Sequence, residues 1–87
     1  MIIFAVLTPG DNPQLEAALN EHFKNEHLKI RPGQYLVAGR TTVMDISSVL
    51  GITDGKSGVG IIFSTSAYYG RADTNVWDWI KVKLGTP

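Results

Sequence analysis

Apolar residues form short runs that predict strands, and these runs lie early, midway and late in the chain. Ile2–Leu7 is a continuous apolar run, and residues 59–66 form a second run with apolar residues on both faces. Runs this short and rich in β-branched and aromatic residues favour strands, and strands without alternation are expected to be covered on both faces. Residues 28–31 and 34–40 flank the turn signal Pro32-Gly33, which predicts a β-hairpin.

Helical periodicity predicts two helices between these strands. The first begins at the N-cap Asn12, with Pro13 in its first turn, and ends near Glu26. The second begins at Thr42 and ends at Gly51, which suits the position just after a helix. The spacing assigns to their buried stripes Leu15, Ala18, Leu19, His22 and Phe23 in the first helix, and Val43, Ile46, Val49 and Leu50 in the second.

A third helix is expected to begin at Asp73 or Thr74 and to bury Val76, Trp77, Ile80 and Leu84. The order is then β-α-β-β-α-β-α in one domain, residues 1–87. Its first six elements predict a ferredoxin-like α+β fold, a βαββαβ antiparallel sheet with an additional C-terminal helix. Such a sheet carries helices on one face, so its other face needs a cover. The C-terminal helix or a second copy of the chain would supply that cover, and the two can coexist.

Composition narrows the class of protein without naming a function. The 87 residues are 44% apolar and 18% charged with zero formal net charge, which is a folded composition without the positive excess of most phosphate-binding domains. The absence of cysteine excludes disulfides, thiolate catalysis and zinc–cysteine sites, and favours a cytoplasmic location. No apolar run approaches the roughly 20 residues that span a bilayer.

Motifs for catalysis, cofactors or metals are weak. In GITDGKSG, only three residues separate Gly51 from Gly55 and a strand follows, so a phosphate-binding loop is not supported. His22 is expected as a packing residue and His27 as the end of the same helix, and their spacing of five does not bring them onto one metal ion. No serine lies in a nucleophile motif. We therefore expect no catalytic residue, no metal and no cofactor.

Two groups of residues are candidate binding surfaces. Lys29, Arg31 and Arg40 surround Tyr35 on the hairpin, a pattern able to hold single-stranded nucleic acid. The favoured alternative is that these charges protect an edge hairpin from aggregation. The second group, a candidate partner interface, comprises Tyr68, Tyr69, Arg71 and Trp79.

Several short motifs resemble the small bacterial proteins of the SinR-like family, which are unrelated to the helix-turn-helix sporulation repressor. The matching pieces are Pro9-Gly10-Asp11-Asn12, Tyr35-Leu36-Val37, Thr41-Thr42 and Trp79-Ile80-Lys81-Val82-Lys83-Leu84. This resemblance implies a ferredoxin-like fold, distantly similar to the small CRISPR-associated adaptation nuclease. It also implies a homodimer and a setting in defence, mobile elements or toxin–antitoxin systems.

One departure from those nucleases bears on activity. They carry a metal-binding aspartate near the end of the first strand, where this chain has Phe4-Ala5-Val6, and alanine cannot coordinate Mg²⁺. A nuclease site would have to use Asp11 instead. The leading hypothesis is thus a homodimeric, non-enzymatic binding module. The alternatives are a metal-dependent RNA or DNA nuclease that uses Asp11 and a small-ligand sensor.

Overall fold

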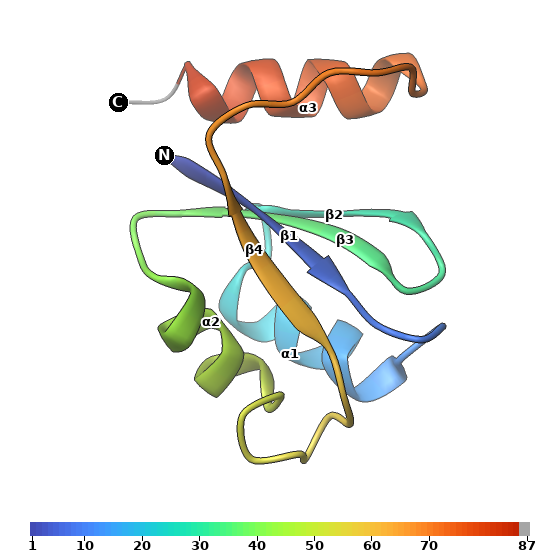
Figure 1. Cartoon of the computed structure of the whole chain (residues 1–87), viewed down its shortest axis with the longest axis vertical. Helices are drawn as coiled ribbons and strands as arrows, with labels where there is room; N and C mark the ends of the chain where they lie inside the picture. Colours follow the sequence, from blue (N-terminus) through green and yellow to red (C-terminus); the bar gives the residue numbers. More distant parts are fainter. Residues whose placement is uncertain (86–87) are drawn as a thin grey trace.

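The computed structural model describes residues 1–85, so the last two residues of the predicted domain lie outside the described part. One four-stranded sheet lies between a layer of two helices and a layer of one helix (Figure 1). In chain order the elements are β1 (Ile2–Leu7), α1 (Pro13–His22), β2 (His27–Arg31), β3 (Gln34–Gly39), α2 (Val43–Leu50), β4 (Ile61–Thr65) and α3 (Thr74–Leu84).

The sheet is antiparallel throughout, with the strand order β2-β3-β1-β4. The apolar strand β1 is central, as its sequence predicts, because it pairs with β3 on one side and with β4 on the other. The two edges are β2 and β4. The predicted order of seven elements is confirmed, and residues 1–85 form an α+β fold with three helices.

The first face of the sheet packs against α1 and α2. Even-numbered residues of β1 and odd-numbered residues of β3 point to this side, where they meet the apolar stripes of the two helices. This first core consists of Phe4, Val6, Leu15, Leu19, Tyr35, Val37, Ile46 and Leu50. Burial of these side chains is the main favourable contribution to folding.

The second face packs against α3 through a smaller core, formed by Ile3, Leu36, Ala38, Val76 and Ile80. Lys83 fixes the end of α3, since its Nζ donates to the carbonyl oxygen of Asn25 (2.7 Å) and lies 3.3 Å from the Glu26 carboxylate. The same ammonium group stands 5.9 Å from the ring of Trp79. The C-terminal helix therefore covers part of the second face within one chain.

Local signals fix the starts of α1 and α2. The Asn12 side chain accepts a hydrogen bond from the Leu15 amide, and the Thr42 side chain accepts one from the Asp45 amide. Gly51 ends α2 in the left-handed conformation, at φ 79°. All three are the residues that the sequence assigns to these positions.

The predicted end of the first helix is wrong. α1 stops at His22 because Phe23 leaves the helical conformation and packs on the first core. His22 is consequently exposed, 3.7 Å from Glu21, and is not a packing histidine. His27 belongs to β2, where its Nδ1 donates to the carbonyl oxygen of Phe23 (2.6 Å).

The sequence also overestimates burial at Val49, at Leu84 and along the last strand. Val49 and Leu84 are half exposed, since each lies at the margin of its helix's buried stripe. The last strand is shorter than predicted and is not covered on both faces, because β4 stands at the edge of the sheet.

Candidate interaction surface at the β4 edge

β4 exposes large apolar side chains although it belongs to the central sheet. Its register with β1 opposes Ile61 to Leu7 and Phe63 to Ala5, so Ile61 and Phe63 point to the second face. Ile61 is 60% exposed and Phe63 is 51% exposed. Exposed large apolar groups that are contiguous, rather than scattered, mark interaction surfaces.

The exposure follows from how little of the second face one helix can cover. A helix is about 10 Å across and neighbouring strands are about 4.8 Å apart, so a single helix does not cover a sheet of four strands. Two helices cover the first face, whereas α3 alone lies on the second face, where it packs over β1, β3 and β2. The uncovered region, here named the apolar strip, consists of Leu7, Val59, Ile61 and Phe63. A hollow of about 350 Å³ opens on it beside Pro9.

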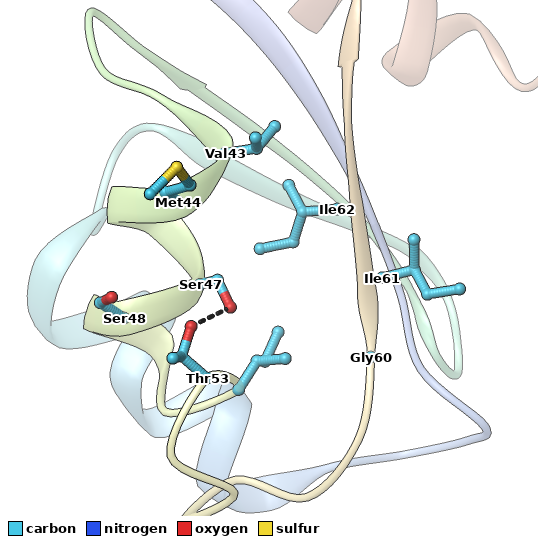
Figure 2. A pocket seen from close by; sticks show the side chains of 9 residues that line it. Val43, Met44, Ser47, Ser48, Thr53, Gly60, Ile61 and Ile62 are labelled. Carbon is cyan, nitrogen blue, oxygen red and sulfur yellow. Dashed lines mark hydrogen bonds between the residues drawn. The ribbon is translucent and has the colours of Figure 1, made fainter.

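A groove follows β4 on the opposite face, between this strand and α2 (Figure 2). Its volume is about 450 Å³, and Ile62 points into it from β4 while Ile61 points away. Val43, Met44 and Ile52 supply the facing apolar wall. The Oγ of Ser47 lies 2.6 Å from the Oγ1 of Thr53 at the lower end of the groove. No charged residue lines it.

The two edges of the sheet differ sharply in charge. No residue from 57 to 70 is charged, and this segment contains the whole of β4. The β2 edge carries Lys29 and Arg31 and an irregularity in register between them. Charges and bulges of this kind stop an edge strand from pairing with another chain. β2 is thus protected against pairing, and β4 is not.

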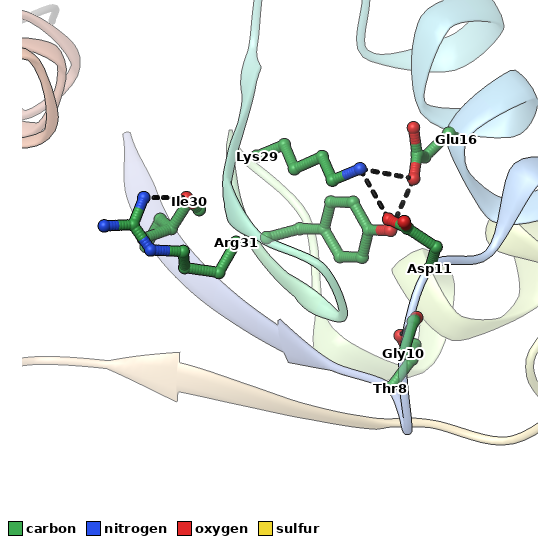
Figure 3. Close-up of polar contacts among 8 residues, drawn as sticks. Thr8, Gly10, Asp11, Glu16, Lys29, Ile30 and Arg31 are labelled. Carbon is green, nitrogen blue, oxygen red and sulfur yellow. Dashed lines mark hydrogen bonds and ion pairs between the residues drawn. The ribbon is translucent and has the colours of Figure 1, made fainter.

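The charges of β2 are paired within the chain (Figure 3). Lys29 Nζ donates to the Asp11 carboxylate at 2.6 Å and to Glu16 Oε2 at 3.2 Å, and the Tyr35 hydroxyl donates to the same Glu16 oxygen at 2.8 Å. The bonds from Tyr35 and Lys29 lower the pKa of Glu16. The bonds to Asp11 and Glu16 raise the pKa of Lys29. Burial is the largest cause that raises the pKa of Tyr35, and the hydrogen bond to Glu16 is the second.

The residues of the predicted nucleic-acid surface do not come together. Tyr35 is only 1% exposed and lies in the first core, so its ring is not accessible to a base. Lys29 extends toward Asp11 and Glu16, whereas Arg31 projects the opposite way, 4.0 Å from Asp73 (Figure 3). Arg40 is exposed beyond the end of β3.

The predicted partner residues are brought together only in part. The ring of Tyr68 lies against that of Trp77 in a tilted arrangement, with centroids 5.9 Å apart and an interplanar angle of 31°, and Tyr69 is fully exposed. Arg71 lies beside a hollow of about 510 Å³ that Arg31 also lines. Trp79 is half-buried against the second core, so it contributes to the attachment of α3.

The apolar strip is the feature that sequence reasoning missed. Ile61 and Phe63 were expected to be covered because a doubly apolar strand is usually central. No signal in the segment from 57 to 70 marks it as an edge, because residues 1–10, which contain the central strand β1, are equally uncharged.

Within residues 1–85, no group of three or more histidine or acidic side chains is arranged to hold a metal ion. No helix among the described residues has the length and apolar character needed to cross a membrane. Comparisons of the chain with protein-family models, with curated proteins and with solved structures found no match.

Proposed function

We propose that this chain is a ferredoxin-like, non-enzymatic protein-interaction module whose binding surface is the β4 edge. The antiparallel order β2-β3-β1-β4, in which β3 separates β1 from β2, supports the ferredoxin-like assignment. The single observation that carries the function is an unprotected edge strand with exposed apolar groups on its second face and an uncharged groove on its first.

Strand addition is the mode of binding that this geometry favours. An extended segment that pairs with an edge strand gains main-chain hydrogen bonds, and its alternate side chains enter pockets on the two faces. At β4, one set of side chains would lie in the groove beside Val43 and Ile62, and the other would lie on Ile61 and Phe63. An uncharged lining favours a segment with uncharged side chains, since a charge buried there would have no partner.

The alternatives have less support. Asp11, on which the nuclease alternative depends, has its carboxylate engaged by Lys29. Lys29 of β2 is paired with two acidic side chains, so it offers little free positive charge to a phosphate backbone. A setting in defence or toxin–antitoxin systems rests on the SinR-like resemblance alone.

A peptide-binding assay tests this function. Fluorescein-labelled nine-residue peptides with alternating valine and serine are titrated with nanomolar to micromolar protein, beside the same peptides with a central lysine. We expect the uncharged peptides to bind more tightly, and Ile61→Lys to weaken their binding while Val82→Lys leaves it unchanged. Val82 is a matched control because it is 63% exposed, on α3.

In the same assay, labelled single-stranded RNA and labelled duplex DNA replace the peptides as probes of a different class of ligand. Tight binding of either nucleic acid that weakens steeply with added salt, together with no response to the uncharged peptides, would overturn the proposal.

A further inference from the structure

We infer that the segment bound at the β4 edge is β4 of a second copy of this chain, paired antiparallel across a two-fold axis. This inference rests on the proposed function and names its partner. The two sheets would join into one continuous sheet of eight strands, each copy contributing the four that it already forms. A two-fold interface brings the same surface of each copy together, so the surface must be self-complementary.

Charge is the first argument for a second copy. Around a two-fold axis each residue of β4 faces β4 itself, so any charge on the strand would face a like charge nearby. The run from 57 to 70 contains no charge, and the formal net charge of the chain is zero. Two copies therefore approach without repulsion at the edge and without a net long-range repulsion.

The second argument is that pairing at this edge closes. Pairing β4 with β4 leaves only the two β2 edges at the ends of the joined sheet. Each β2 edge carries Lys29, Arg31 and the register irregularity between them. Those features oppose further addition, so the assembly stops at two copies and does not extend into a fibre.

The third argument is the surface that becomes covered. A stable interface of standard size takes about 800 Å² from each partner. That is about one seventh of this chain's accessible surface of 5576 Å². The apolar strip and the groove lie on the two faces of β4, so a partner strand beside β4 would bring its alternate side chains against Ile61 and Phe63 on one face and against Ile62 on the other.

Phe63 is the middle residue of β4, which spans Ile61–Thr65. An axis at this residue would set Phe63 of one copy opposite Phe63 of the other, on the apolar strip. Directly opposed residues of antiparallel strands have Cα atoms about 4.5–5.5 Å apart, which falls within the range that a disulfide spans.

The first experiment measures mass by sedimentation from about 1 to 200 μM for the wild type, Ile61→Lys, Ser64→Lys and Val82→Lys. Ser64 is exposed on the other face of β4, so two variants probe the edge from opposite sides. We expect a dimer for the wild type and Val82→Lys, and at least a tenfold weaker dimer for each β4 variant. Circular dichroism must show the native fold in every variant that is scored.

Two further readouts separate edge pairing from any other dimer. Backbone amides of β4 that point away from β1 should exchange with deuterium at least tenfold more slowly in the dimer than in Ser64→Lys. Because the chain has no cysteine, Phe63→Cys should form one cross-linked dimer on mild oxidation, whereas Val82→Cys should not.

A wild type that is monomeric at 200 μM would overturn the inference, as would a dimer whose β4 amides all exchange as fast as in the monomer. Failure of the inference is separable from failure of the proposed function. A monomer that still binds the uncharged peptides at β4 keeps the interaction module and excludes the second copy. A monomer that binds no peptide overturns both.

Discussion

Removal of one oxygen atom tests whether the hydrogen bond between the buried Tyr35 and Glu16 stabilises the fold. Tyr35→Phe keeps the ring in the first core and deletes the hydroxyl that donates to Glu16 at 2.8 Å. A hydrogen bond to a charged group contributes about 1.5–3 kcal/mol. Glu16 is about one third exposed and keeps its bond from Lys29, so we discount that range for solvent screening to about 1–2 kcal/mol.

The expected loss is a measurable part of the total stability. A chain of this length is stable by about 4–13 kcal/mol, at about 0.05–0.15 kcal/mol per residue. With a slope near 1 kcal/mol per M of urea for a small domain, the unfolding midpoint of Tyr35→Phe should fall by about 1–2 M. Urea titration at a fixed protein concentration, followed by the fluorescence of Trp77 and Trp79, measures this midpoint. Tyr69→Phe is the matched control, because that side chain is fully exposed.

The pH dependence supplies the sharper test. The pKa of Glu16 is lower in the folded chain than its ordinary value of 4.5, with the bond from Tyr35 as the largest cause. A group with a lowered folded pKa stabilises the fold above its unfolded pKa and loses that effect as the pH falls through the folded pKa. The difference in unfolding midpoint between wild type and Tyr35→Phe should therefore have its full size at pH 7 and shrink below pH 4.5. Equal midpoints at pH 7, or a gap of constant size down to pH 2, would refute the reasoning.

Three further predictions concern the turns, the attachment of α3 and the dimer. A Cβ at Gly33 (φ 80°) would lie 2.5 Å from the carbonyl oxygen of Thr8, whereas a Cβ at Gly55 (φ 79°) meets nothing within 4 Å. Gly33→Ala should therefore lower the free energy of unfolding by about 2 kcal/mol or more, and Gly55→Ala by about 1 kcal/mol. Equal shifts of the melting temperature in the two variants would contradict this. The side chain of Lys83 is 15% exposed and pairs with Glu26, so Lys83→Ala should lower the free energy of unfolding, measured by thermal unfolding, by about 1–2 kcal/mol. Lys81 is exposed, so the control Lys81→Ala should lower it by no more than about 0.5 kcal/mol. Because residues 57–70 carry no charge, the dimer dissociation constant should change less than about threefold between 50 mM and 500 mM salt by sedimentation, and a steep dependence would indicate a charged interface instead.

The structure was predicted well where the signal depends only on residues that are near one another in the sequence. The run Ile2–Leu7 gives the bounds of β1, and Asn12, Thr42 and Gly51 occupy the cap positions expected of them. Caps and turns depend on contacts between residues that are three or four positions apart, so their chemistry is legible before any tertiary contact is known.

Burial was harder to predict because it depends on which elements become neighbours. The segment from 34 to 39 is apolar on both faces, so its sequence alone does not place the Tyr35 ring in the first core beside Glu16. β1 and β4 look alike as apolar runs, yet β1 has two strand neighbours and β4 has one. The pairing partners of Lys29 come from α1 and the loop before it, at separations of 13 and 18 residues.

The place of β1 at the centre of the sheet has a consequence for synthesis of the protein. Ile3 pairs with Ala38 on one side and with Thr65 on the other, so its second neighbour is made 62 residues later. At about 5–20 residues per second, ribosomes need roughly 3–12 s to reach that neighbour. During this interval β1 is doubly apolar and has an open side. The nascent chain thus exposes an apolar strand with one unpaired side for several seconds, which is the kind of segment that promotes aggregation during folding.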